Sequence, residues 1–222
     1  MGDHPIVLPM SAQRVIAFLA LHGRPLLRSF VAGALWLDSA EDRAAASLRS
    51  VLWRMEEPAP RLLEASNQHL ALSPAVEVDL TRARNEARLV LESSFDLQRA
   101  DAVKPDFEQD VLPQWYEDWV LVERERFRQL RLRTLETLSR QLLLADRFGP
   151  ALEAGMAAVA AEPLRESAHR AVIAVHLAEG NQAEAVRQYR MYRRLLHDEL
   201  DAEPSPLIED VMEGVLGHGR AS

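Results

Sequence analysis

The sequence has 222 residues, no cysteine and 48% hydrophobic residues. The lack of cysteine excludes disulfide scaffolds, thiol nucleophiles and cysteine-ligated zinc or iron–sulfur sites. No stretch approaches 18 uninterrupted apolar residues, so we expect no membrane-spanning helix and no membrane partner. Lys and Arg total 26 against 34 Asp and Glu, a formal net charge of −8. This balance disfavours a general polyanion binder, but charge must be judged on each face, because only the docking surface meets phosphate.

Three helices are predicted in the first 55 residues. A short apolar run at residues 6–8 is at best one edge strand between prolines. Ser11 is expected to cap a helix over residues 11–21, and a second helix is expected over residues 26–36. Ser39 begins a sequence with capping-box spacing, so a third helix is expected from there to Met55.

A β-hairpin is predicted after the third helix. Residues 62–65 and 69–72 are apolar runs, and Ser66-Asn67-Gln68 between them is typical of a turn. Three helices followed by a hairpin is the winged-helix arrangement, which we assign to residues 1–80.

Residues 81–222 are predicted to be almost entirely helical. A short helix is expected over residues 81–91, and a long helix over residues 115–146 after a looser connector. Ala151 and Ala185 then occupy equivalent positions of similar stretches that are 34 residues apart, which is the period of tetratricopeptide (TPR) repeats. The fold class expected for the whole chain is therefore mainly α: a winged helix followed by an all-helical TPR-like domain.

The third helix carries candidate DNA-contacting residues. On a helical wheel one side is apolar and is expected to pack inward; it holds Ala45, Leu48, Leu52 and Met55. The opposite side is polar and consists of Arg43, Ser47, Ser50 and Arg54, while Arg49 and Trp53 lie between the two sides. Arginine can pair with guanine edges or phosphates, and serine lets the backbone approach a major groove. A solvated amphipathic helix has the same pattern, and the hairpin that follows favours the groove-binding interpretation.

Other charges in residues 1–80 oppose DNA binding. This segment has seven arginines, no lysine and nine acidic residues. Glu56 and Glu57 follow the third helix, where cations would suit both the helix dipole and phosphate. The predicted hairpin turn has no Arg or Lys to enter a minor groove. We therefore expect weak binding by a monomer and a need for dimerisation or a protein partner.

Catalytic and metal-binding patterns are missing. The sequence has no glycine-rich phosphate loop, no Gly-x-Ser-x-Gly elbow and no His-Glu-x-x-His, so we expect no enzyme activity, no cofactor and no metal. His169 and His176 are expected to be satisfied helix histidines rather than metal ligands. Trp115, Trp119 and Val122 share a helical face that fits either a ligand pocket or a seam against the N-terminal unit.

The chain resembles the Streptomyces antibiotic regulatory proteins. The first half resembles their OmpR-type winged helix at Ser11-Ala12-Gln13-Arg14, Phe18-Leu19-Ala20-Leu21-His22-Gly23, Ala34-Leu35-Trp36 and Ala46-Ser47-Leu48-Arg49-Ser50-Val51-Leu52-Trp53-Arg54. The second half resembles their bacterial transcriptional activator domain at Trp115-Tyr116-Glu117-Asp118-Trp119, Glu162-Pro163-Leu164-Arg165-Glu166, Gly180-Asn181-Gln182-Ala183-Glu184-Ala185, Tyr189, Glu199-Leu200 and Glu203-Pro204-Ser205-Pro206. Family members usually have several strands before the position of Ser11, so the N-terminal sheet is expected to be truncated here.

The resemblance implies a cytoplasmic transcription regulator that binds direct repeats in promoter DNA, commonly as a homodimer, and helps recruit RNA polymerase. It places Ser47, Arg49, Ser50, Trp53 and Arg54 along the DNA-facing helix, and Arg28 near a phosphate. The alternative is an interaction or ligand-sensing module, built on the same scaffold, that does not bind DNA.

Overall fold

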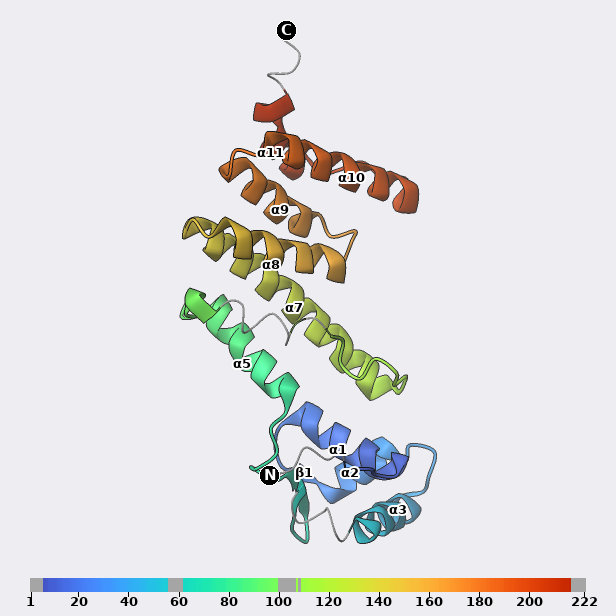
Figure 1. The fold of residues 1–222 in the computed structure, drawn as a ribbon. Coiled ribbons are helices and arrows are strands. Elements are labelled where there is room, and N and C mark those ends of the chain that lie inside the picture. The colour runs from blue at the N-terminus through green and yellow to red at the C-terminus, as the bar shows by residue number, and fades with distance from the viewer. Residues whose placement is uncertain (1–5, 56–61, 100–106, 108, 217–222) are drawn as a thin grey trace. The chain divides into compact units, whose positions relative to one another are not determined.

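The computed structural model describes residues 6–55, 62–99, 107 and 109–216, and the side chains of all of these except 99 and 214–216 (Figure 1). Its contacts divide the chain into two compact units, Met1–Arg82 and Ala83–Ser222. The fold class predicted from the sequence is confirmed: a winged helix is followed by a TPR-like helical domain.

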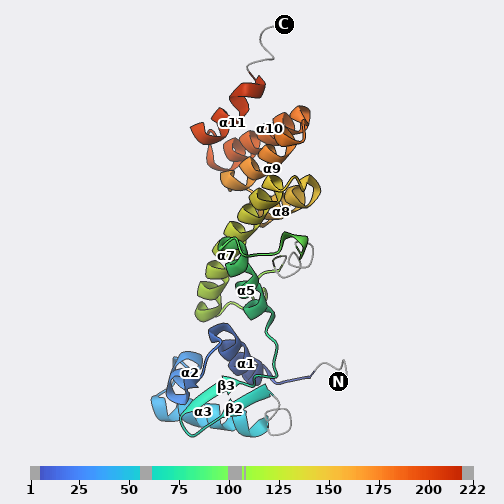
Figure 2. The same cartoon turned by 90° about the vertical axis from the view of Figure 1, so that its left-hand side faces the viewer.

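The first unit combines three helices with a small sheet. Its elements are α1 (Met10–His22), β1 (Leu26–Leu27), α2 (Arg28–Leu35), α3 (Glu41–Arg54), β2 (Leu63–Ala65) and β3 (His69–Leu72). The strands pair antiparallel in the order β1-β3-β2, with Leu26 opposite Leu70 and Leu63 opposite Leu72. Figure 2 shows β2 and β3 side by side. The predicted hairpin is therefore confirmed. Phe18, Leu26 and Leu70 are buried where the helices cover the sheet.

Two predicted details of the first strand and second helix are wrong. Residues 6–8 form no strand, and Val7 is 92% exposed, so no neighbouring backbone pairs with this run. Leu26 and Leu27 were expected to begin the second helix but form β1 instead. Their backbone pairs with β3, and the amide of Arg28 donates to the carbonyl oxygen of Gln68 at 2.8 Å. Helix α2 can begin only after this pairing ends.

The predicted serine caps are also wrong. Helix α1 begins at Met10, one residue before Ser11, because Pro9 precedes it with a φ of −57° and its carbonyl accepts the first helical amides. Helix α3 is preceded by Ala40 rather than Ser39, and no side chain caps it. In α3 the acidic residues Glu41 and Asp42 of the first turn interact favourably with the helix dipole.

The second unit is a succession of helices. These are α5 (Asp79–Leu91, which begins in the first unit), the 3-10 turn η1 (Leu97–Arg99), α7 (Asp118–Leu144), α8 (Phe148–Ala161), α9 (Glu166–Ala178), α10 (Gln182–Leu200) and α11 (Pro206–Leu216). From α7 onward each helix packs on the next one along the chain, as the stack in Figure 1 shows. The result is a layered stack in which each helix is covered by its neighbours along the chain.

Helix α7 begins three residues later than predicted, at Asp118 rather than Trp115. Arg124 accounts for the difference, because its guanidinium donates to the backbone carbonyls of Val111 at 3.0 Å and Trp115 at 2.8 Å, and also to that of Leu112. These carbonyls belong to residues that precede α7, and Arg124 is a residue of α7. The segment over residues 111–115 therefore lies back along the helix that follows it.

The 34-residue repeat is visible in both packing and backbone. Ala151 in α8 and Ala185 in α10 are each fully buried at the equivalent position of a helix pair. Asp146 and Gly180, also 34 residues apart, both have positive φ angles, 55° and 84°, in the turns between α7 and α8 and between α9 and α10. A small residue lets neighbouring helices approach closely, which explains the spacing seen in the sequence.

Gly155 of α8 marks a close approach between helices of this stack. A Cβ atom at this position would lie 3.0 Å from Cγ2 of Val172 and 3.3 Å from Oγ of Ser139. That hydroxyl donates to the carbonyl oxygen of Ala151 at 2.8 Å. Helices α7, α8 and α9 therefore meet at a point where any side chain larger than that of glycine would have to displace its neighbours.

We predict that Gly155→Leu lowers the free energy of unfolding by about 1–3 kcal/mol, because a branched side chain must displace Val172. Gly149→Leu in the same helix is the matched control, since its Cβ would meet nothing within 4 Å. Urea unfolding followed by circular dichroism measures both. Equal stability of the two variants would contradict the close packing described for Gly155.

His169 joins α9 to its neighbours within the core. Its side chain is fully buried, and its ring centroid lies 4.4 Å from that of Tyr192. Nε2 lies 2.8 Å from the carbonyl oxygen of Pro163, so Nε2 carries the proton and donates it. Nδ1 then accepts from the amide of Gln188 at 2.9 Å. As expected from the sequence, His169 is a satisfied helix histidine, and it is held in its neutral form. The same expectation is wrong for His176, whose Nδ1 is buried and has no hydrogen-bond partner among the described residues.

We predict that His169 makes stability depend on pH. Burial lowers the pKa of His169 in the folded state below its usual value of about 6.5. Its stabilising contribution is therefore complete above pH 6.5 and is lost as the pH falls through the folded-state pKa, because the unfolded chain takes up the proton first. Between pH 7.5 and 5 the advantage of the wild type over His169→Gln should shrink, by at most about 1.4 kcal/mol per pH unit. Denaturant unfolding across this range is the measurement, and a constant difference would refute the prediction.

Candidate nucleic-acid interface

The buried side of α3 is rotated from the one predicted. Ala44, Leu48, Val51 and Met55 are buried, and they recur at spacings of four, three and four residues. Leu48 and Met55 were expected there, but Ala45 and Leu52 are only half-buried. The expectation for those two residues is wrong, because contacts with α1 and α2 select Ala44 and Val51 from the two apolar candidates at each turn.

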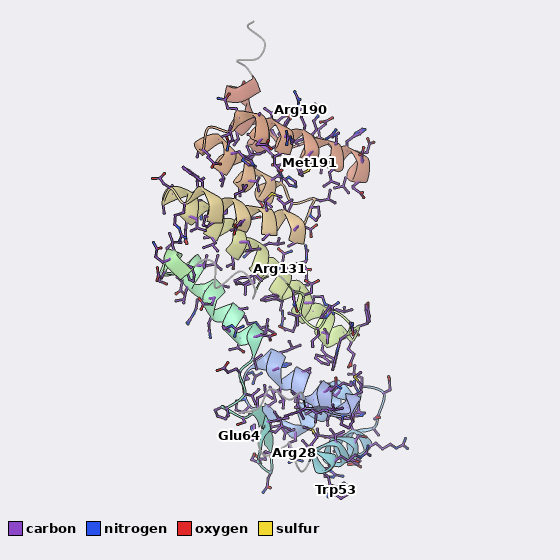
Figure 3. The ribbon with its side chains drawn as sticks, in the orientation of Figure 1. Arg28, Trp53, Glu64, Arg131, Arg190 and Met191 are labelled. Atoms are coloured by element: carbon purple, nitrogen blue, oxygen red, sulfur yellow. The ribbon has the colours of Figure 1, made fainter. Side chains whose placement is uncertain are left out.

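This rotation changes which residues lie furthest from the core. On a 100° wheel the row directly opposite the buried side is Asp42, Ala46, Arg49 and Trp53, and all four are exposed. Arg49 and Trp53 therefore lie on the outermost row instead of between two faces. Trp53 is 69% exposed, and Figure 3 places it on the outside of α3.

The four residues predicted to oppose the core flank this outermost row. Arg43 and Arg54 are exposed, whereas Ser47 and Ser50 are half-buried. Nη2 of Arg54 donates to Oγ of Ser50 at 2.9 Å, so two of the candidate residues contact each other. Within the part of the chain that the structure describes, Arg43 and Arg49 form no hydrogen bond or ion pair. The cationic groups of α3 are thus directed to solvent and are not neutralised by described carboxylates.

Arg28 lies apart from the candidates on α3. It is the first residue of α2, and its Nη1 donates to the carbonyl oxygen of Ser66 in the hairpin turn at 3.0 Å. Together with its backbone bond to Gln68 this contact fixes the turn to the start of α2. Figure 3 shows Arg28 in this unit near the sheet. Arg28 therefore has a structural contact that sequence analysis did not foresee.

The hairpin adds no positive charge to the interface. Oγ of Ser66 accepts from the amide of His69 at 2.9 Å and closes the turn. No Arg or Lys occurs between residues 62 and 72, and Glu64 on β2 is exposed (Figure 3). Glu56 and Glu57, which the sequence sets against DNA binding, lie outside the described residues. Positive charge in this region is therefore concentrated on α3.

Arg14 supports the position of the helices behind this surface. Its Nη2 donates to the carbonyl oxygen of Leu35 at 2.7 Å, and its guanidinium carbon lies 5.9 Å from the ring centroid of Trp36. The end of α2 is thereby tied to α1, and α2 in turn packs against α3. This arginine holds the scaffold, whereas those of α3 face outward.

Metal binding and membrane insertion were both considered for the described residues. These residues contain no group of three or more His, Asp or Glu side chains placed to hold a metal ion. No described helix combines the length and apolar character needed to cross a bilayer.

The aromatic run before α7 was predicted to form a ligand pocket or a seam. Trp115 and Trp119 are half-buried with ring centroids 6.0 Å apart, and Nε1 of Trp119 donates to Glu117 at 2.7 Å. Whether this aromatic run forms a pocket or a seam stays a prediction.

Comparison with known proteins identifies regulatory relatives. The chain is 28% identical over 217 residues to the regulatory protein AfsR of Streptomyces coelicolor (strain ATCC BAA-471 / A3(2) / M145), and 24% identical over 225 residues to the regulatory protein AfsR of Streptomyces griseus. Both alignments take in 94% of this chain but only 22% of the relative. The chain thus spans about a fifth of the length of these curated relatives.

A solved structure shows the same fold. EmbR of Mycobacterium tuberculosis, determined in complex with a low-affinity phosphopeptide, superposes with a TM-score of 0.65 at 20% identity, over 96% of this chain and 61% of EmbR. The family model described as the bacterial transcriptional activator domain matches residues 78–216, which is more than half of the chain. The chain therefore belongs to the bacterial transcriptional activator domain family, which confirms the resemblance drawn from its sequence.

Proposed function

We propose that this chain is the DNA-binding and activating part of a transcription regulator. The first unit would bind promoter repeats through the major groove with α3. The second unit would mediate homodimerisation and contact with RNA polymerase in the cytoplasm. Membership of the activator-domain family and the two relatives named as regulatory proteins support a regulatory, non-catalytic role.

The observation that carries the DNA-binding proposal is the outward position of arginines on α3 that form no ion pair with a described carboxylate. Arg49 lies on the outermost row beside Trp53, and Arg54 flanks it in the same last two turns. A guanidinium fork matches the two acceptors of a guanine edge, and the indole supplies apolar contact to a thymine methyl or a sugar. Ser47, Ser50 and Arg43 would contact the walls of the groove from the flanking row.

Charge along α3 indicates which part enters the groove. Glu41 and Asp42 occupy its first turn and are exposed, so phosphate would be repelled there. The C-terminal half, from Arg49 to Arg54, has no described carboxylate on its outer rows. We therefore propose that this half lies deepest in the groove. Arg28 would approach a phosphate only while keeping its bond to the hairpin turn.

The small number of cations implies weak binding by one copy. Each phosphate contact adds to the salt dependence of binding, so three to five contacts, rather than ten, give a modest affinity that falls quickly with salt. Two copies on a direct repeat would add their contacts. This requirement agrees with the hairpin, which supplies no cation of its own.

We predict that Arg49→Ala and Arg54→Ala each weaken binding to a cognate duplex by about 1–3 kcal/mol. The duplex is first obtained by selection from random sequences at low salt, and affinity is then measured by fluorescence anisotropy at two salt concentrations. Arg24→Ala is the matched control, because Arg24 is exposed in the same unit but lies outside α3.

Indifference to DNA would overturn this proposal. If wild type selects no sequence, or if the Arg49 and Arg54 variants bind as tightly as the Arg24 variant, α3 does not read DNA. The non-DNA-binding interaction module would then be the better account of the first unit.

A further inference from the structure

Helix α10 borders an open groove of about 760 Å³ that the proposed DNA-binding role does not use. Its lining includes Arg187, Arg190, Arg193, Arg194 and His197, with the small apolar side chains Ala183 and Val186 at the N-terminal end. We call this surface the arginine groove. From residue 183 to residue 197 it runs along roughly 21 Å of helix.

The packing of α10 produces this concentration of charge. Ala185, Tyr189, Tyr192 and Leu196 face inward and form a core cluster with Ile208 and Met212 of α11. The arginines then recur on the solvent side, and Arg190 is exposed in Figure 3, with Met191 (40% exposed) beside it. The arginines at positions 187, 190, 193 and 194 thus share one side of the helix.

Two of the four arginines are neutralised within the chain and two are not. Nη1 of Arg187 lies 3.2 Å from Glu184, and Nε of Arg193 lies 2.9 Å from Glu203. The contact with Arg193 lowers the pKa of Glu203, which keeps that pair ionised. Arg190 and Arg194 form no hydrogen bond or ion pair with any described residue.

The unpaired arginines are one helical turn apart. Like charges four residues apart destabilise a helix. Repulsion between Arg190 and Arg194 therefore destabilises α10 unless an anion lies between them. The whole chain carries a formal charge of −8, which makes an exposed cationic strip on it unusual. This arrangement suits a ligand that brings its own carboxylates.

We propose that the arginine groove binds an acidic segment of a partner protein, with its carboxylates on Arg190 and Arg194 and its apolar side chains on Ala183 and Val186. Arginine pairs with carboxylate through two parallel hydrogen bonds, which fixes the orientation of such a segment. Because the groove lies in the second unit, this proposal goes beyond DNA binding by α3 and does not depend on it.

Charge at the C-terminal end of α10 favours a peptide over nucleic acid. Asp198, Glu199 and Asp201 are exposed there, and Glu203 lines the groove itself. A phosphate backbone carries closely spaced charge and would meet these carboxylates. A peptide can place its acidic residues opposite Arg190 and Arg194 alone.

The test is binding of the full chain to a fluorescein-labelled 14-residue peptide that has glutamates three and four residues apart and leucines between them. A twin peptide with glutamine in place of glutamate is the ligand control. The double variant Arg190→Ala/Arg194→Ala removes both unpaired cations, and both side chains lie outside the core. Arg133→Ala is the matched protein control, since Arg133 is an exposed arginine within α7 and outside the groove.

We expect the acidic peptide to bind, the double variant to bind at least tenfold more weakly, and the Arg133 variant to bind like wild type. Affinity should also fall as salt is raised. Equal binding of the two peptides, or no effect of the double variant, would overturn the proposal. So would loss of duplex binding or of self-association in the double variant without loss of peptide binding, because the groove would then serve DNA or a second copy. None of these outcomes alters the test of Arg49 and Arg54 on α3.

Discussion

The rotation of α3 about its own axis determines what the first unit can present to another molecule. Burial of Ala44, Leu48, Val51 and Met55 places Arg49 and Trp53 opposite the core. Had Ala45 and Leu52 been buried instead, the outermost row would have held Arg43 and Arg54. The two rotations of α3 would bury similar apolar side chains. One buries Ala44 and Val51, and the other would bury Ala45 and Leu52. Contacts with α1 and α2 decide between them, and Arg14 helps to hold these two helices together.

The overall acidity of the chain conceals where its cations lie. Ion pairs use many of the arginines of the second unit, as when Arg165 meets Glu136 at 2.5 Å and Arg84 meets Glu123 at 2.8 Å. Each paired arginine adds the same formal charge to the total as Arg49 or Arg190. A paired arginine nevertheless contributes little to the electrostatic potential around the protein, because its carboxylate partner cancels it. A negative total is therefore compatible with two cationic helix faces, one in each unit.

Patterns that depend on local sequence were predictable. The hairpin followed from two apolar runs around a short polar turn, and the repeat followed from Ala151 and Ala185, because both features leave a fixed spacing in the chain. Features that depend on distant partners were not predictable. Leu26 and Leu27 have a helical pattern, yet they form a strand because β3 offers them hydrogen bonds. The inward side of α3 was ambiguous for the same reason, since neighbouring apolar residues compete and only tertiary packing selects between them.

Arginine is the residue whose role sequence could assign least well. Arg28, Arg124 and Arg14 all donate to backbone carbonyls and fix a turn, a connector and a helix end. Arg49, Arg190 and Arg194 have the same side chain on equally polar helix faces, but no described group accepts from them. Because a guanidinium stays charged at any physiological pH, the distinction lies entirely in its partners. An exposed arginine without a partner retains its full capacity to bind an anion, and both helices proposed here as binding surfaces are defined by that property.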